Sequence, residues 1–181
     1  SAVFMGGIGE FDDYLEINVD RNNDTAPGVL NAFDNNAPSN GGIYLDELSG
    51  DMEVDTVDTV ADVSLRTRAG SIRDARGGGT GDAAANVLAQ TIDIDANGGS
   101  IGNPDGSNDL EIDSRRGSLA GTDDVGLEAS GSIFLTETDG NLRLVLAHAY
   151  TGDIRLTVRE SADLDEHLEL LASGSARFAE D

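Results

Sequence analysis

The densest group of oxygen-donor side chains in the sequence is the run Asn103-Pro104-Asp105-Gly106-Ser107-Asn108-Asp109. Its carboxylates and amides alternate with turn-forming residues, and Ca²⁺ prefers hard oxygen ligands that a flexible loop supplies. We therefore predict that Asp105 and Asp109 bind calcium. The simpler interpretation of the same run is an Asx-type turn between Ile101 and Leu110, in which the side chains bond to their own backbone.

Other chemistry-bearing groups are sparse. The run Gly78-Gly79-Thr80-Gly81-Asp82 resembles the start of the calcium nonapeptide of RTX toxins, but its Asp falls one place early and no second copy follows. His148 and His167 are the only histidines. Neither has sequence neighbours that would make it a base or a ligand, so we predict structural roles for both. Asp93 and Asp95 alternate along an expected strand and should lie on its outer face.

Carboxylate pairs are abundant, and carbohydrate-active enzymes use such pairs. A cleft for a polysaccharide also needs other side chains, however, and this chain has five Phe, three Tyr, no Trp and no Lys. We therefore predict no catalytic residues and no cofactor apart from the possible calcium ion. A carbohydrate-active β-helix enzyme and a calcium-dependent binding module are the alternatives to a structural protein.

The charge balance excludes some partners. The 181 residues include 35 acidic and 11 basic ones, which gives a net charge of −24, and every basic residue is Arg. Such a chain repels nucleic acid and anionic membranes and stays soluble in salt. No apolar run reaches the roughly 18 residues that a membrane-spanning helix needs, so we predict no membrane insertion. Without Cys, the chain can form neither disulfides nor thiolate metal sites.

A short pattern recurs along the chain: an alternating apolar strand, then Gly-Ser, then another alternating strand. The clearest example is Leu127 to Glu137, with Gly131-Ser132 at its centre. The other Gly-Ser pairs of this pattern are Gly70-Ser71, Gly99-Ser100, Gly117-Ser118 and Gly174-Ser175. A unit this short cannot bury its own apolar face, so it must stack on further copies of itself.

A longer repeat contains the short one. Gly42 to Glu47 aligns with Ser132 to Glu137 at an offset of 90 residues. This offset divides a single domain, 1–181, into modules at about 6–97 and 98–165, with a partial copy at the C-terminal end. We expect 20–40 and 73–85 to be surface loops, since both interrupt the strand pattern. The segment 163–172 fits either a strand or a helix, and its match to the repeat around Leu127 favours the strand.

These patterns predict an all-β protein, a right-handed parallel β-helix of about eight or nine coils of 19–22 residues. A sandwich or a barrel would give each strand different neighbours, whereas a parallel β-helix gives every coil the same environment and therefore the same sequence pattern. The residues expected to point into the core are Ile17, Leu45, Val54, Leu65, Ile94, Ile112, Leu127, Leu135, Leu144, Leu156 and Leu170.

Strings such as Gly99-Ser100-Ile101-Gly102 and Gly131-Ser132-Ile133-Phe134 resemble the filamentous-haemagglutinin-like adhesins, which are giant bacterial exoproteins. The resemblance rests on the recurring order of strand, Gly-Ser turn and strand over nearly the whole chain. It implies a right-handed β-helix, export to the cell surface or the medium, and a role as an adhesin or filament component. Cell-surface polysaccharide is the partner that such a role suggests.

The ends of the sequence are apolar rather than polar. Phe4 lies near the start and Phe178 near the end, and neither is in a sequence typical of a polar cap. A β-helix without caps exposes unpaired backbone groups. We therefore expect the coils to continue end to end, into adjacent repeats or into copies of the same chain.

Overall fold

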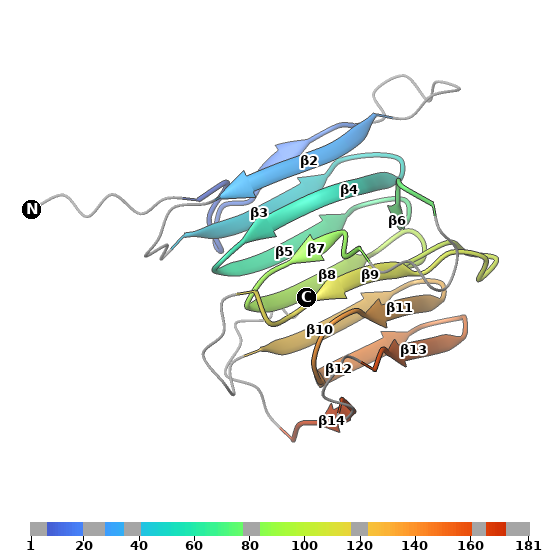
Figure 1. Ribbon diagram of the computed structural model, residues 1–181. Coiled ribbons are helices and arrows are strands. Elements are labelled where there is room, and N and C mark those ends of the chain that lie inside the picture. The colour runs from blue at the N-terminus through green and yellow to red at the C-terminus, as the bar shows by residue number, and fades with distance from the viewer. Residues whose placement is uncertain are drawn as a thin grey trace, which may run out of the picture.

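The computed structural model describes residues 7–19, 28–34, 41–77, 84–116, 123–160 and 166–172 (Figure 1). Within these ranges the chain is all β, with two sheets of seven strands each, and the paired strands within each sheet are parallel. The all-β prediction is therefore confirmed. Among the described residues, none belongs to a helix with the length and apolar character required to cross a membrane.

The first sheet contains the strands that alternate with those of the second along the chain. Its spatial order is β1 (Leu15–Ile17), β3 (Gly42–Glu47), β5 (Asp62–Thr67), β8 (Thr91–Ala96), β10 (Asp124–Ala129), β12 (Leu142–Ala149) and β14 (Leu168–Leu170). The prediction of a strand near Leu168 is confirmed by β14.

The second sheet is less regular. Its spatial order is β2 (Val29–Asp34), β4 (Met52–Thr59), β7 (Val87–Leu88), β9 (Leu110–Asp113), β11 (Ile133–Glu137) and β13 (Ile154–Val158), and β6 (Ile72–Asp74) also pairs with β4. We call one strand of the first sheet, together with the segment of the second sheet that follows it, a rung.

Successive rungs add to the same edge of each sheet, but their lengths vary. Paired residues are 19 positions apart between Asp124 and Arg143, and 33 apart between Ile92 and Val125. The predicted rung length of 19–22 residues is therefore wrong for much of the chain. Among the described residues, segment 102–109 leaves the sheet between Ile101 and β9 and returns, so it lengthens a rung without changing the pairing of its strands.

The core lies between the two sheets, where alternate side chains of both meet in one cluster. This alternation follows from the pleat of a strand, which sends successive side chains to opposite faces. Of the residues expected to point inward, Ile17 and Leu156 are partly buried against this cluster. Leu45, Val54, Leu65, Ile94, Ile112, Leu127, Leu135 and Leu144 are buried in it. Leu170 is 73% exposed, so its expected burial is wrong, because no further strand pairs with the open side of β14 among the described residues.

The repeated Gly-Ser pairs form one corner of the stack, where the chain passes from the first sheet to the second. We call this column the Gly-Ser corner; its members are Gly50-Asp51, Gly70-Ser71, Gly99-Ser100, Gly131-Ser132 and Gly152-Asp153. The N–H of Ser71 donates to Asp51 Oδ1 at 2.7 Å, and the N–H of Ser100 donates to Ser71 Oγ at 3.0 Å. Ser132 and Asp153 repeat the contact, each donating its N–H to the serine hydroxyl one rung earlier.

Glycine is required in this column because the rungs approach so closely. A Cβ on Gly70, whose φ is +136°, would lie 2.0 Å from the carbonyl oxygen of Gly50. The pattern found in the sequence is therefore the pattern of rung-to-rung contact. The pairs Gly117-Ser118 and Gly174-Ser175 lie outside the described residues.

Two predictions about the loops need correction. The segment 20–40, expected to be a loop, contains strand β2; Gly28 precedes the strand, and positions 20–27 and 35–40 lie outside the described residues. Strand β2 points Leu30, Ala32 and Asp34 inward, and a core-facing row with Ala and Asp hides the apolar alternation. The segment 73–85 begins inside β6 and leaves the sheet after Asp74, as expected for most of it.

The 90-residue repeat joins strands of opposite sheets. Ile43 in β3 belongs to the first sheet, and its counterpart Ile133 in β11 belongs to the second. The two sheets therefore provide such similar environments that strands of similar sequence occur in both.

Candidate functional site

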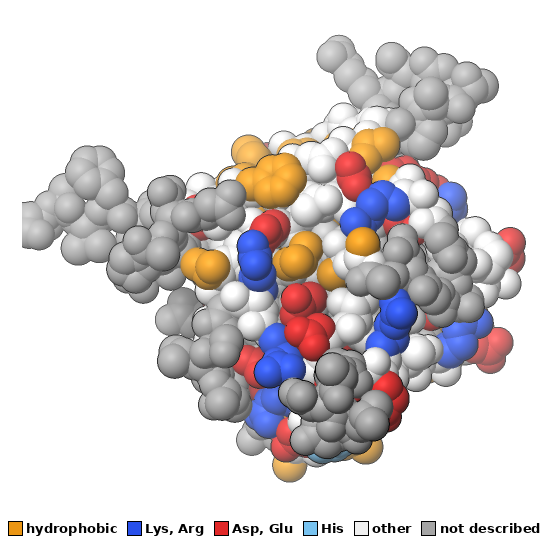
Figure 2. All heavy atoms as spheres, in the orientation of Figure 1, with side chains coloured by type: hydrophobic (Ala, Val, Ile, Leu, Met, Phe, Trp, Pro, Cys, Tyr) orange, Lys and Arg blue, Asp and Glu red, His pale blue; other side chains and the backbone are white. Residues whose placement is uncertain are grey.

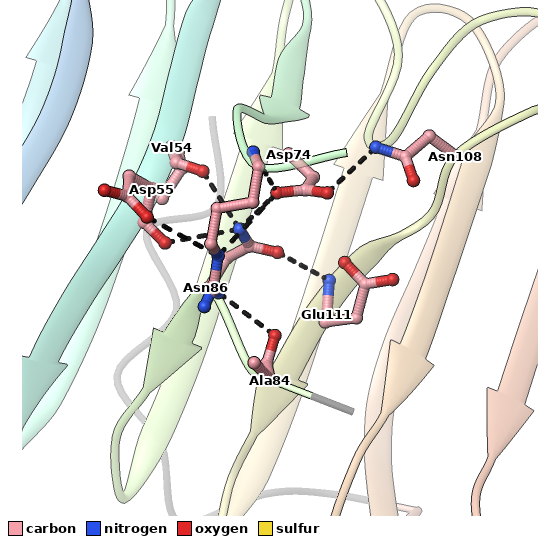
Figure 3. A network of polar contacts seen from close by, with 8 residues as sticks. Val54, Asp55, Asp74, Ala84, Asn86, Asn108 and Glu111 are labelled. Atoms are coloured by element: carbon pink, nitrogen blue, oxygen red, sulfur yellow. Dashed lines mark hydrogen bonds and ion pairs between the residues drawn. The ribbon is translucent and has the colours of Figure 1, made fainter. Parts of the chain in front are cut away.

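A cluster of hydrogen-bonded polar side chains lies where the second sheet is interrupted. Strand β6 ends at Asp74 and β7 begins at Val87; in the next rung, Ile101 bridges to both Ile72 and Ile133 before β9 begins at Leu110. The chain therefore leaves the sheet after Asp74 and after Ile101, at the same position in successive rungs. Polar side chains meet at the base of the two excursions (Figure 3).

Asn86 replaces a missing piece of strand. Its side chain is fully buried between β4 and β9. Nδ2 donates to the carbonyl of Val54 at 3.0 Å, and Oδ1 accepts the N–H of Glu111 at 3.1 Å. Oδ1 thus gives the N–H of Glu111 the acceptor that a continuous strand would supply from its backbone, whereas the carbonyl of Val54 also accepts the N–H of Ala75 at 2.9 Å.

Asp74 closes the base of both excursions. Its Oδ1 accepts the amide of Asn86 at 2.6 Å and the N–H of Arg76 at 2.8 Å, and its Oδ2 accepts Nδ2 of Asn108 at 2.9 Å. Arg76 in turn donates to the carbonyl of Ala84 at 3.0 Å, which ties the two ends of segment 75–84 together. The hydrogen bonds of this cluster therefore hold the bases of the two excursions together.

The predicted calcium ligands have different surroundings. Asp109 is fully buried, and its carboxylate accepts hydrogen bonds from Thr136 Oγ1 at 2.9 Å and from the guanidinium of Arg155. Asp105 is exposed and accepts the N–H of Ser107 at 2.9 Å. Hydrogen bonds from Ser107 hold the pKa of Asp105 below its usual range.

Arg155 occupies the place that an ion would need beside Asp109. It also donates to the carbonyl of Gly106 at 2.9 Å, and its guanidinium lies 4.6 Å from the centre of the Phe134 ring. Calcium binding at Asp109 would have to displace this arginine, and the site stays a prediction. Within the described ranges no group of three or more His, Asp or Glu side chains is arranged to hold a metal ion. The segment Gly78 to Asp82 lies outside them.

A second type of buried carboxylate caps the neighbouring rung. Glu137 is fully buried, and it accepts the N–H of Ser114 at 3.1 Å and the hydroxyl of Ser114 at 2.8 Å. Burial raises the pKa of Glu137 well above its usual value. Glu47, its counterpart 90 residues earlier, accepts the N–H of Val19 at 2.8 Å in the same manner. Both acids therefore serve backbone donors of the rung before them.

On the outer face of the first sheet, Asp93 and Asp95 lie where the alternation predicts, but they are 5% and 4% exposed. Ser64 donates to Asp93 Oδ2 at 2.9 Å and shares a hydrogen bond of 2.7 Å with the Tyr14 hydroxyl. Arg66 lies 4.1 Å above the Tyr14 ring and 3.9 Å from Asp95 Oδ2. Burial raises the pKa of Tyr14. These contacts tie the segment before β1 to the sheet.

The two histidines lie apart from these clusters. Nδ1 of His148 is 3.6 Å from a carboxylate oxygen of Glu128, and its ring centre is 4.2 Å from that of Tyr150. His167 connects through its backbone, donating its N–H to Asn141 Oδ1 at 3.0 Å. These contacts are compatible with the structural roles expected for both.

Arginines connect acidic side chains on different rungs. Arg68 bonds to Asp46 at 2.7 Å and to Glu16 at 3.1 Å, and Arg143 lies between Asp124 and Glu169. On the face shown in Figure 2, blue arginines accordingly lie next to red carboxylates. Each such arginine offsets repulsion between acidic rungs.

The sequence singled out the loop containing Asp105 and Asp109 but missed Asn86 and Asp74. Nothing in Ala84-Ala85-Asn86-Val87 distinguishes that asparagine from one in an ordinary loop, since its role comes from strands 25 and 32 residues away. No protein-family model, curated protein or solved structure matches this chain.

Proposed function

We propose that this chain is a stretch of right-handed parallel β-helix that serves as a structural and adhesive module of a large secreted repeat protein or extracellular filament. The observation that carries the proposal is the Gly-Ser corner, in which each rung donates a backbone N–H to the rung before it. Two parallel sheets joined by alternating connections support the β-helix, and such connections are right-handed in almost all proteins.

The use of the repeated residues supports a structural role. The serines and glycines of the corner contact the next rung, and the arginines join neighbouring acids. The buried carboxylates of Asp74, Asp109 and Glu137 accept hydrogen bonds from the protein itself. An enzyme of the polysaccharide-cleaving type needs two carboxyl groups about 5 to 10 Å apart that face a substrate, whereas these three bond to side chains and backbone groups of their own and neighbouring rungs. We therefore favour a scaffold over a catalyst.

The net charge supports a location in an aqueous medium outside the cell. A net charge of −24 keeps the module soluble and prevents unspecific binding to anionic membranes. The adhesive target that we propose is a cell-surface polysaccharide, since its hydroxyl groups can bond to the many carboxylates of the outer faces.

The first test of the proposal is where the protein is located. Antibodies raised against the purified chain should label intact source cells or precipitate the protein from the medium. An antibody against a cytosolic enzyme serves as the control for leakage. Labelling that appears only after the cells are permeabilised would exclude a surface role.

Incubation with polysaccharides tests whether the chain binds or cleaves them. The chain should bind at least one member of a panel of neutral and acidic polysaccharides, measured by retention on immobilised polymer, and should leave the polymer length unchanged. Heat-denatured chain is the control for unspecific retention. Release of new reducing ends would establish the carbohydrate-active enzyme instead.

A further inference from the structure

An Asn-Gly pair lies in the turn that follows β8, in the middle of the Gly-Ser corner. The pair is Asn97-Gly98, and the N–H of Gly99 donates to the carbonyl of Ala96 at 3.3 Å, which closes the turn around it. The structure describes the corners of the rungs before and after this turn. The pair therefore lies inside the stack, away from both of its ends.

The two groups of this pair that can react with each other make no other contacts. Both residues are exposed. Within the part of the chain that the structure describes, neither the side-chain amide of Asn97 nor the N–H of Gly98 has a hydrogen-bond partner. Asn86 provides the contrast, because its amide is buried and bonded at both polar atoms. The amide of Asn97 can therefore turn toward the nitrogen of Gly98 without breaking a hydrogen bond.

Packing against the preceding rung requires glycine at position 98. A Cβ on Gly98 would lie 2.4 Å from the Cα of Ala69 and 2.4 Å from the nitrogen of Gly70. The corners after β3 and β12 have Ser49 and Thr151 at the equivalent position, so the Asn-Gly pair belongs to this corner and not to the repeat. Because glycine has no side chain, nothing on residue 98 shields its own backbone nitrogen. The contact between rungs thus maintains a reactive sequence in an exposed turn.

We propose that Asn97 is a site of spontaneous covalent modification, in which it loses ammonia through a cyclic imide. The nitrogen of Gly98 attacks Cγ of Asn97, so that a bond forms between these two atoms, the bond from Cγ to Nδ2 breaks, and the proton of the Gly98 N–H leaves with the ammonia. Water then opens the imide at either carbonyl. One product is aspartate and the other is isoaspartate, whose main chain is one methylene longer. The inference is independent of the proposed function, because the reaction needs only water.

The two products have different effects on the stack. The N–H of Asn97 donates to the carbonyl of Thr67 at 3.2 Å, and the carbonyl of Asn97 accepts the hydroxyl of Ser130. Isoaspartate inserts a methylene between these two backbone groups, so the bonds to the rungs before and after cannot both keep their geometry. Aspartate leaves the main chain unchanged, and the register of β5 with β8 places residue 97 beside Arg68, whose charge favours a carboxylate. Isoaspartate should therefore weaken the corner, whereas aspartate should not.

The test is peptide mapping of the whole chain after incubation at mildly alkaline pH, with mass spectrometry for the loss of ammonia and chromatography to separate the two products. We expect Asn97 of the folded chain to convert at a rate within about tenfold of its rate in urea. Asn18 is the internal control, because it is also exposed but precedes Val19, whose branched side chain shields its N–H and whose N–H is bonded to Glu47. A greater slowing in the folded chain, or equal conversion of Asn18, would overturn the proposal.

Two variants test the effect on the stack. Asn97→Gln keeps the amide but would have to close a six-membered ring, so it should stay intact, and Asn97→Asp adds the charge without lengthening the main chain. After equal incubation, wild type should unfold at a lower urea concentration than Asn97→Gln, whereas fresh Asn97→Asp should unfold close to fresh wild type. Reaction at the second Asn-Gly pair, 40–41, is common to wild type and Asn97→Gln and cancels in their comparison. Equal unfolding of the two incubated proteins, with Asn97 converted to isoaspartate, would overturn the predicted weakening of the corner.

Discussion

The Gly-Ser corner and the interrupted part of the second sheet connect rungs by different means. At the corner, successive rungs repeat one contact, in which a serine or aspartate N–H donates to the side chain at the same place one rung earlier. In the interrupted part, where the chain leaves the sheet after Asp74 and after Ile101, one asparagine supplies the acceptor that a strand would have given to the N–H of Glu111.

The difference teaches what repetition in this sequence means. Residues repeat where each rung has the same neighbours, and they become unique where a rung has unlike neighbours. Repeated residues therefore mark the regular rungs of the stack. Asn86 and Asp74, which do not repeat, mark the place where the rungs are irregular. Substitutions in the two regions should separate these contributions.

The largest effect is expected at the corner. Gly70→Ala should lower the free energy of unfolding by about 3 to 5 kcal/mol, because the new Cβ clashes with backbone and the residue has a positive φ. Gly77→Ala is the control, since Gly77 also has a positive φ, +66°, but has nothing within 4 Å of a Cβ. It should cost about 1 kcal/mol. Urea unfolding followed by circular dichroism measures both, and equal losses would contradict the close packing of the corner.

A smaller loss is expected in the interrupted part. Asn86→Ala should cost about 2 to 3 kcal/mol, because it leaves the buried N–H of Glu111 without its acceptor and removes a donor from Asp74. Asn103→Ala, which removes only an exposed bond to Ser107, should change stability by less than about 0.5 kcal/mol. The same urea titration compares them. If Asn86→Ala were as mild as Asn103→Ala, the side chain would not be replacing a strand.

The capping acids give a pH-dependent effect. Burial raises the folded-state pKa of Glu137 above its unfolded value, so the protonated form is favoured in the fold. Its contribution to stability is fully present below the unfolded pKa and is lost as the pH rises through the folded pKa. Glu137→Gln should therefore become more stable relative to wild type as the pH is raised.

Chemical denaturation of both proteins across the acidic and neutral range measures this difference. Glu160→Gln, on the exposed surface, is the control for the change in net charge. A constant gap between Glu137→Gln and wild type at every pH would show that Glu137 has the same pKa in both states. Asp113, which also repels charge on Glu137, is unchanged in the comparison.

The smallest effect concerns ions. Sodium chloride should raise the melting temperature by screening the net charge of −24. If Asp105 and Asp109 bind calcium, low-millimolar calcium should raise the melting temperature beyond sodium chloride of equal ionic strength, and the double Asn variant should lose that excess. The comparison is made within each protein, because Asp109→Asn also weakens the contact with Arg155. Equal shifts from the two salts would leave only screening.

The sequence predicted the features that depend on local patterns, namely alternating apolar residues and Gly-Ser pairs. The apolar faces around Leu65, Ile94 and Leu127 marked their strands, and the Gly-Ser pairs marked the corner. Strand β2 was missed because Ala32 and Asp34 occupy inward positions. The length of the rungs was wrong because an excursion such as 102–109 adds residues without adding a strand.

The site was less predictable than the fold. The loop 103–109 was visible as a cluster of oxygen donors, but the partners of Asp109 come from β11 and β13, which lie 27 and 46 residues later. Asn86 has no local signature, since the groups that it serves belong to rungs before and after its own. Burial of Leu170 was wrongly expected because strand alternation says which way a side chain points and not whether another rung covers it.

The side-chain amide of Asn86 has a consequence for how such a protein can change over generations. Because one residue bonds to the strands on both sides of the gap, the chain can leave the sheet after Asp74 and return at Val87 while the neighbouring strands keep their pairing. The packing of the core then does not constrain the length or the composition of the excursion. New surface features can be gained at this position by insertion, and the rungs on either side need no compensating substitution.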